Sequence, residues 1–433
     1  MPLPRPLQLT VCGSLVGIAA GAAAALFLWS LELVTQLHWK HPALLFLLPL
    51  AGLLSGVVYA FIGGRAEGGT ELVLREIREP ATGVPARMAP LVLAGTLLTH
   101  LCGGSAGREG TAVQMGASLA AVLAGWLRVP ATQLPQLLTC GLAAGFAGVF
   151  GTPLAGTVFA LEVSTRGRSA EPFPGSAKRL LPSLPSLLLC LLAAFIAHET
   201  ADVLGVAHTH YQIAGFSDGN GGHRFLPASS GDLLLFSAAA GTAGVAFGLA
   251  AGLFTQLRNA VRTCFRLYVS RVWMRPVIGG LAVVLLALLT GDSSFLGLGV
   301  EASPLRPGDV CIRSCLEAAP VGWLSWFWKL LFTAVTVGSG FKGGEVTPLF
   351  FVGAALGNFL SGPLALPAGL LAAMGFVAVF AGATGTPLAC TLMAWELFIP
   401  YNPELLSFSF LSSTAICCLV AAHCSGSVSI YDA

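Results

Sequence analysis

The stretch Gly103–Gly116 reads GGSAGREGTAVQMG and interrupts a chain that is otherwise strongly apolar. Four glycines in its first eight residues disfavour a helix there, because glycine loses more backbone entropy than any other residue when it is ordered. Small and apolar residues follow from Thr111, so the second half predicts a helix. We therefore expect an unwound segment that leads into a helix N-terminus, where N–H groups and the helix dipole favour an anion.

Glu109 places a carboxylate at the start of that expected helix. A carboxylate at an anion site suggests either a competitor for the anion or a proton carrier. The simpler interpretation is a loop glutamate paired with the neighbouring Arg108. Ionisable groups inside a membrane are functional by default, so we favour a functional role for Glu109 over a loop residue that only pairs with Arg108.

The composition indicates a polytopic membrane protein. The chain has 433 residues, of which 55% are hydrophobic and only 10% charged, whereas about a quarter of a soluble domain is charged. We expect an all-α fold in which some helices span the bilayer and others are short, broken or re-entrant. The longer apolar runs are 11–34, 43–62, 89–102, 181–198, 230–254, 276–290, 321–337, 349–362, 366–395 and 405–422. No basic patch interleaved with aromatic residues occurs, so we expect no nucleic-acid partner.

Two clusters of basic residues set the predicted topology. The first contains Arg166, Arg168, Lys178 and Arg179, and the second contains Arg258, Arg262, Arg266, Arg271 and Arg275. By the positive-inside rule both clusters lie in cytoplasmic loops, which places the intervening loop near 199–228 outside.

Three histidines in that external loop, His208, His210 and His223, are candidate metal ligands. Their spacing matches no recognised ligand set, so we favour a solvated polar loop and expect neither a bound metal nor a cofactor. His100, which precedes the opening stretch, is interpreted as a packing residue rather than a proton relay.

The chain contains an internal repeat. GTPLAGTVFALE at Gly151–Glu162 returns as GTPLACTLMAWE at Gly385–Glu396, with eight of twelve positions identical. The opening stretch also has a counterpart, GGEVTPLFFVGAALG at 343–357, in which Gly353 matches Gly116. The sequence separation of Gly116 and Gly353 is nearly the same as that of Gly151 and Gly385. Because the two offsets nearly agree, we predict two related halves, each with a glycine-rich break before an apolar helix.

The charge pattern favours an inverted relation between these halves. A basic loop follows Glu162, whereas residues 397–404, after Glu396, contain no Lys or Arg.

We interpret Glu162 and Glu396 themselves as ordinary polar helix ends. We assign the halves to 1–228 and 229–433 and expect no cytoplasmic regulatory domain. Paired breaks in inverted halves indicate a binding site near the membrane midplane.

Two further segments are candidates for anion contact. Gly68–Leu72 is a third glycine-rich break before a short helix, and either Thr70 faces an anion there or it is only the N-cap. Tyr431, near the chain end, is either an interfacial anchor or a hydroxyl donor to a buried anion.

These residues resemble the CLC family of anion channels and anion/proton exchangers, and the resemblance covers nearly the whole chain. Gly107–Thr111 is similar to the family's Gly-Lys/Arg-Glu-Gly-Pro motif, which implies that Glu109 is the external gate. Gly344–Pro348 resembles the Gly-x-Phe-x-Pro motif, and Tyr431 falls where the family has its central tyrosine. The resemblance implies inverted halves and a homodimer with one pathway per subunit. It implies anion contact at Gly69, Thr70, Arg108, Gly110, Val346, Thr347 and Tyr431.

The departures from the family pattern resemble its fluoride-exporting branch. The chloride-binding serine motif is replaced by Gly-Gly-Thr-Glu-Leu, the proline after the gate is Thr111, and the motif phenylalanine is Val346. We therefore expect a fluoride/proton antiporter in the lipid bilayer of the plasma (inner) membrane.

The resemblance also raises a question about the proton path. The chloride/proton branch carries an internal glutamate directly after the one that matches Glu162, and here that position is Val163. Glu345, in the second half's break, is the best substitute, since a carboxylate beside a bound anion binds a proton more readily. The alternative is that Glu345 pairs with Lys342 or caps the helix at Val346.

Two other functions compete with fluoride export. A chloride channel or chloride/proton exchanger of the same family is the first. An intramembrane serine protease built on Ser105 and His100 is the second, but it leaves the duplicated halves unexplained.

Overall fold

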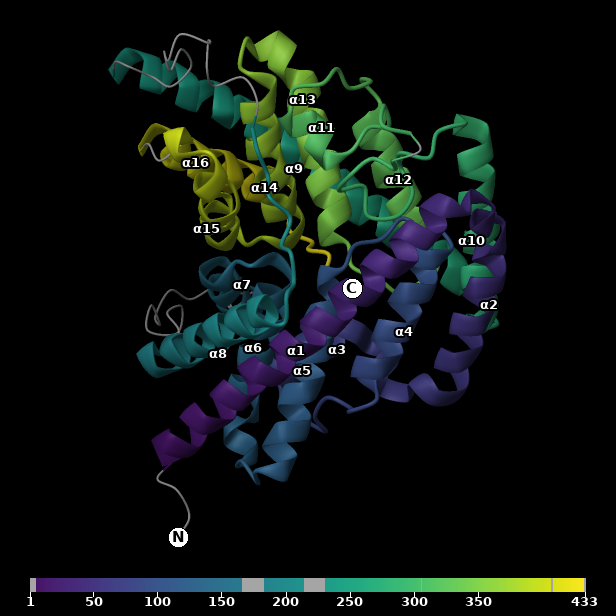
Figure 1. Ribbon diagram of the computed structural model, residues 1–433, viewed down its shortest axis with the longest axis vertical. Coiled ribbons are helices and arrows are strands. Elements are labelled where there is room, and N and C mark those ends of the chain that lie inside the picture. Colours follow the sequence, from purple (N-terminus) through teal and green to yellow (C-terminus); the bar gives the residue numbers. More distant parts are fainter. Residues whose placement is uncertain (1–4, 166–182, 214–229, 305, 406–407, 432–433) are drawn as a thin grey trace. The chain divides into compact units, whose positions relative to one another are not determined.

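The computed structural model describes residues 5–165, 183–213, 230–304, 306–405 and 408–431, and this part of the chain is almost entirely helical (Figure 1). The α-helices are α1 Arg5–Lys40, α2 Leu48–Val58, α3 Gly69–Arg78, α4 Met88–Leu101, α5 Glu109–Trp126, α6 Leu134–Phe150, α7 Pro153–Thr165, α8 Leu184–Val203, α9 Ser230–Tyr268, α10 Arg275–Thr290, α11 Ile312–Leu316, α12 Ser325–Gly338, α13 Val346–Leu364, α14 Ala368–Thr384, α15 Pro387–Phe398 and α16 Phe408–Cys424. Short turns of tighter or wider helix are η1 Pro42–Leu47, η2 Tyr59–Gly63, η3 Gly64–Gly68, η4 Ala131–Gln133, η6 Val272–Met274, η7 Ile399–Tyr401 and η8 Pro403–Leu405.

The described helices match the prediction of an all-α membrane protein. Seven of them are long and apolar enough to cross a bilayer, and several shorter apolar helices accompany them. The seven candidate spans are Leu7–Lys40, Pro42–Arg78, Ala131–Phe150, Leu184–Val203, Leu233–Tyr268, Val272–Thr290 and Val346–Leu364. The apolar run 366–395 is not one helix but two, because Gly385 adopts a left-handed conformation with φ of 68° and Pro387 starts α15.

The predicted second basic loop is wrong in part. Arg258, Arg262 and Arg266 lie on α9, which continues to Tyr268. Their spacing of four residues places them on one face of a helix, and this regularity distinguishes them from a loop. The first basic cluster, His223 and the predicted boundary at 228/229 lie outside the described residues.

The chain divides into two compact units, each assembled from separate segments. The first unit comprises Met1–Ser30, Ile62–Ala94 and Glu109–Thr209, and therefore includes α3 and α5–α8. The second unit comprises Leu31–Phe61, Gly95–Arg108 and His210–Ala433, and includes α2 and α9–α16. The two units are defined by which residues pack together, whereas the predicted halves, 1–228 and 229–433, are defined by the sequence repeat.

Within the first unit, α5 and α6 pack closely at glycines. A Cβ atom on Gly116 would collide with the carbonyl oxygen of Gly141, and one on Gly141 would collide with that of Gly116. α6 ends at Gly151, which is left-handed with φ of 71°, and Pro153 starts α7 two residues later. Small residues let two helix backbones approach, which is how helices associate where lipid removes the hydrophobic driving force.

The second unit repeats this arrangement in α13 and α14, which lie side by side (Figure 1). A Cβ atom on Gly353 would collide with the carbonyl oxygen of Gly375, and a Cβ atom on Gly375 would collide with the carbonyl oxygen of Gly353. The left-handed Gly385 ends α14 as Gly151 ends α6. The repeat found in the sequence is therefore also a repeat of helix packing.

We expect Gly116→Ala to destabilise the protein by about 1–3 kcal/mol, because the added methyl group overpacks the α5–α6 contact. Gly125→Ala on the same helix is the matched control, since a Cβ atom there meets no atom within 4 Å and alanine favours helix by roughly 0.5–1 kcal/mol. Thermal unfolding of the detergent-purified protein compares the two. Equal melting temperatures for both variants would contradict the close helix contact.

Candidate functional site

In the first unit, Glu109 is the first residue of α5 and only 1% of it is exposed. The segment before it is not helical, because α4 ends at Leu101 and Gly103 is left-handed with φ of 75°. This confirms the predicted unwound stretch and its helix. Glu109 and Gly110 thus occupy the first turn of α5, where the helix dipole favours negative charge.

The predicted contact residues Gly69 and Thr70 lie beside α5 within the same unit. Thr70 Oγ1 accepts a hydrogen bond from Nε2 of Gln114, a residue five positions after Glu109, at 3.2 Å. Gly69 is left-handed with φ of 52°, and a Cβ atom on it would meet the Gln114 amide at 3.3 Å. The N-cap interpretation of Thr70 is wrong, because Gly68 is the N-cap of α3 and Thr70 is inside the helix.

Gln114 is a further candidate anion-contact residue that the sequence analysis did not identify. Its signal is a polar side chain within an apolar helix, little more than one turn after the buried Glu109. An amide there can donate to Thr70 and still offer a second N–H.

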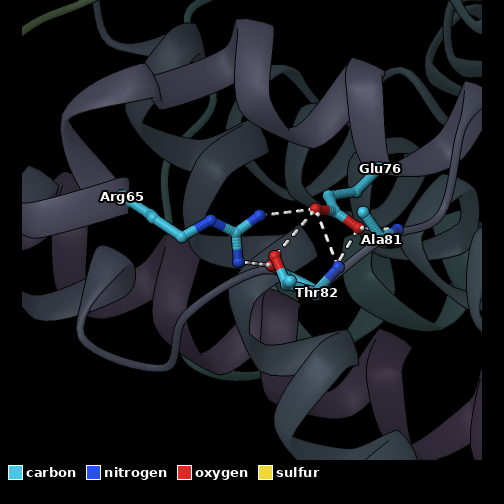
Figure 2. Close-up of polar contacts among 5 residues, drawn as sticks. Arg65, Glu76, Ala81 and Thr82 are labelled. Atoms are coloured by element: carbon cyan, nitrogen blue, oxygen red, sulfur yellow. Dashed lines mark hydrogen bonds and ion pairs between the residues drawn. The ribbon is translucent and has the colours of Figure 1, made fainter.

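A buried carboxylate, Glu76, fixes the other end of α3 (Figure 2). Its Oε2 accepts hydrogen bonds from the backbone N–H groups of Ala81 at 2.9 Å and Gly83 at 3.0 Å. Its Oε1 accepts from Thr82 N at 3.3 Å and pairs with Nη2 of Arg65 at 2.5 Å. Several donors satisfy the hydrogen-bonding capacity of this carboxylate, which is only 2% exposed. We therefore interpret Glu76 as a structural residue that holds the loop after α3 in place.

In the second unit, the two glycine-rich breaks pair through their backbones. The N–H of Gly107 donates to the carbonyl of Gly344 at 2.6 Å, and the N–H of Gly344 donates back to Gly107 at 2.7 Å. Gly107 lies two residues before the start of α5, and Gly344 two residues before the start of α13. Gly107 and Gly344 are as far apart in the sequence as Gly116 and Gly353, so they are equivalent positions of the repeat.

Glu345, the predicted second proton carrier, forms a nearly buried ion pair. Its Oε1 lies 3.3 Å from Nη1 of Arg258, and the two side chains are 12% and 8% exposed. Glu345 is the N-cap residue of α13, as the capping alternative predicts, but its side chain makes no capping hydrogen bond. The ammonium group of Lys342, the other alternative partner, lies 4.0 Å from the centre of the Tyr59 ring.

Arg258 also connects Glu345 to the end of the chain. Its Nη2 donates to the carbonyl of Ile430 at 3.0 Å, next to the predicted contact residue Tyr431. The Tyr431 N–H in turn donates to Ser429 Oγ at 3.3 Å, and the Ile430 N–H donates to the carbonyl of Ala383 on α14 at 3.0 Å. The chain end is therefore held against α14, with Val346 and Thr347 buried in the first turn of α13.

The second unit gives no support to a serine protease. The Ser105 hydroxyl forms its hydrogen bond with Thr333 Oγ1 at 2.9 Å. A nucleophilic serine needs a base within hydrogen-bond reach, and the expected base was His100.

Comparison with known proteins shows the family to which the chain belongs. Residues 51–426 match the voltage-gated chloride channel family. A chloride/fluoride channel protein of Pseudomonas syringae pv. tomato is 38% identical over 437 residues, covering 100% of this chain and 87% of that protein. The chain is thus a multi-pass membrane protein of an anion-transporting class, and it belongs to the CLC (voltage-gated chloride channel) family.

Solved structures agree with this assignment. The crystal structure of a CLC-type fluoride/proton antiporter is similar with a TM-score of 0.83 and 33% identity, over 98% of this chain and 96% of that chain. A slow cyanobacterial Cl⁻/H⁺ antiporter is similar with a TM-score of 0.74 and 19% identity, over 98% and 96% of the two chains. The second likeness shows the fold alone.

We expect Arg258→Met to destabilise the protein by about 3–5 kcal/mol, since it leaves the Glu345 carboxylate buried without its counter-charge. The double variant Arg258→Met/Glu345→Met should recover part of this loss, because apolar side chains replace the whole pair. Thermal unfolding in detergent measures both.

The control is Arg313→Met, which removes one partner of the exposed Arg313–Glu301 pair and should cost no more than about 1 kcal/mol. A double variant less stable than Arg258→Met would contradict the assigned ion pair.

Proposed function

We propose that this chain is a fluoride/proton antiporter that exports fluoride with Glu109 as its gate. The observation that carries the proposal is a nearly buried carboxylate in the second glycine-rich break, Glu345, placed directly before α13. A proton-coupled exchanger needs a titratable group besides its gate, and Val163 provides none at the position used by the chloride/proton branch. The 33% identity to a fluoride/proton antiporter over nearly the whole chain supports the same function.

Fluoride suits a site made of helix N-termini and small polar groups. It is compact and strongly hydrated, so a protein must replace the lost water with closely spaced N–H and O–H donors. Each unit by itself offers one such helix start, that of α5 in the first unit and that of α13 in the second, with a dipole of the favourable sign. Within the first unit, Thr70 and Gln114 add a hydroxyl and an amide beside α5. Within the second unit, Thr347 adds a hydroxyl in the first turn of α13.

The proposed cycle alternates two occupants of one anion position. Ionised Glu109 occupies the position and blocks it, and protonated Glu109 withdraws so that fluoride enters. Each exchange then moves a proton one way and fluoride the other. Because hydrogen fluoride is a weak acid, cells in acidic surroundings accumulate fluoride, and inward protons would drive its export.

Glu345 is proposed as the carrier that completes the proton path. Its ionised form pairs with Arg258, so a proton bound by Glu345 would replace this ion pair. Arg258 also holds the chain end at Ile430, which links proton uptake at Glu345 to the position of Tyr431. We further propose that the protein acts as a homodimer in the plasma (inner) membrane, with one pathway per subunit.

The expected selectivity is fluoride over chloride. Purified protein is reconstituted in liposomes loaded with either anion, and efflux is followed with ion-selective electrodes, with protein-free liposomes as the control. We expect protein-dependent fluoride efflux and little chloride efflux, because the chloride-binding serine motif is absent. Chloride release as fast as fluoride release would instead support a chloride channel or exchanger.

Glu109→Gln removes the titratable group and keeps its size, so we expect loss of proton-coupled fluoride exchange. The readout is proton uptake and fluoride release recorded together from the same liposomes. Glu301→Gln, in an exposed ion pair, is the control and should behave like the parent. A Glu109→Gln variant that still drives protons at the parent ratio is incompatible with the gate.

Glu345→Gln is expected to keep fluoride movement but weaken or abolish its coupling to protons. The same paired recording gives the ratio of protons to fluoride. Unchanged coupling, at equal protein content and folding, would remove Glu345 from the mechanism and direct attention to Glu162.

A further inference from the structure

We propose a zinc-binding site at the C-terminal end of α8, formed by His198, Asp202 and His208. All three residues belong to the first unit, and none of them takes part in the proposed ion pathway. One ligand atom from each lies within 4.8 Å of the others. Two imidazole nitrogens and one carboxylate oxygen are a donor set that Zn²⁺ uses, with a fourth position left for water.

The first two ligands come from successive turns of one helix. His198 and Asp202 are four residues apart on α8, so their side chains lie on the same face. His198 Nε2 lies 3.6 Å from Asp202 Oδ2. Adjacent ligand atoms around a tetrahedral zinc ion are separated by about 3.3 Å, so little movement is needed.

A tight turn returns the third ligand to this face. The N–H of Val206 donates to the carbonyl of Ala201 at 3.1 Å, and the N–H of Gly205 donates to that of Asp202 at 2.8 Å. Gly205 is left-handed with φ of 79°, which completes a Schellman motif at the end of the helix. Val206 anchors the turn by packing with Ala201 and with Ala25 of α1.

His208 is fixed on the far side of that turn. Its Nε2 lies 3.2 Å from Asp202 Oδ1, and its ring packs on Gly151, where a Cβ atom would meet Cδ2 at 3.0 Å. The rings of His198 and His208 are 5.6 Å apart between centroids. Both imidazoles therefore lie beside the same carboxylate, each near a different oxygen.

The surroundings favour a cation with access to solvent. The Asp202 side chain is 45% exposed, whereas those of His198 and His208 are 23% and 13% exposed. A helix C-terminus carries partial negative charge, which also favours a cation. By the positive-inside prediction this end of α8 faces outside, so external Zn²⁺ would reach it.

The proposed site uses other residues than the set considered from histidine spacing alone. That set comprised His208, His210 and His223. The structure instead packs His210 against Tyr401, with ring centroids 4.3 Å apart and the rings tilted by 60°, and His223 lies outside the described residues. The sequence signal that was missed is the His-x-x-x-Asp spacing of His198 and Asp202, followed by the Gly205 turn.

The test is calorimetric titration of the full-length, detergent-purified protein with Zn²⁺ after removal of metal by a chelator. We expect one Zn²⁺ per chain and a higher melting temperature in its presence. His198→Ala and His208→Ala should each weaken binding by on the order of 100-fold or more, since even outer-shell changes cost about 10–100-fold.

His210→Ala is the matched control and should bind Zn²⁺ like the parent. Asp202→Asn keeps the shape, with a hydrogen-bond acceptor for one histidine and an N–H donor for the other, so it should fold normally yet lose tight binding. Absence of Zn²⁺ binding by the parent, or parental affinity in Asp202→Asn or in both histidine variants, would overturn the proposal.

Discussion

The reciprocal backbone pairing of Gly107 and Gly344 is the contact on which the proposed site depends. Each glycine belongs to a break that leaves backbone groups without helical partners, and buried groups of this kind must be paired. The pairing satisfies the backbone N–H and C=O groups of both glycines. In the sequence, each glycine lies two residues before the start of a helix, α5 or α13.

This pairing also carries information about symmetry. The bridge is antiparallel, and it joins two residues that are equivalent in the sequence repeat. An antiparallel bridge between equivalent residues is two-fold symmetric, as inverted halves related by an axis in the membrane plane require. The contacts Gly116–Gly141 and Gly353–Gly375 involve equivalent helices of the sequence repeat, so each unit by itself contains the same close packing of two helices at glycines. The ionisable side chains do not follow this symmetry. In the sequence repeat Arg108 corresponds to Glu345, and Glu109 corresponds to Val346.

Local features of the sequence were sufficient to predict the breaks, the helices after them and the repeat, because glycine content, apolar runs and self-similarity are properties of short segments. The partners of Glu345 and Thr70 were not predictable in this way. Arg258 lies 87 residues before Glu345, and Gln114 lies 44 residues after Thr70. Such contacts depend on tertiary packing, which no spacing rule describes. The misassigned basic loop is a different case, since the four-residue spacing of Arg258, Arg262 and Arg266 already indicated a helix.

The central claim is that fluoride and protons move in opposite directions through one coupled cycle. The most direct measurement imposes a fluoride gradient across liposomes containing the purified protein, with equal pH on both sides and the membrane potential clamped. We predict that fluoride leaving down its gradient draws protons in and acidifies the liposome interior, opposite in sign to the change that outward diffusion of hydrogen fluoride causes in protein-free liposomes. Fluoride gradients that dissipate through the protein without any accompanying proton movement would contradict it.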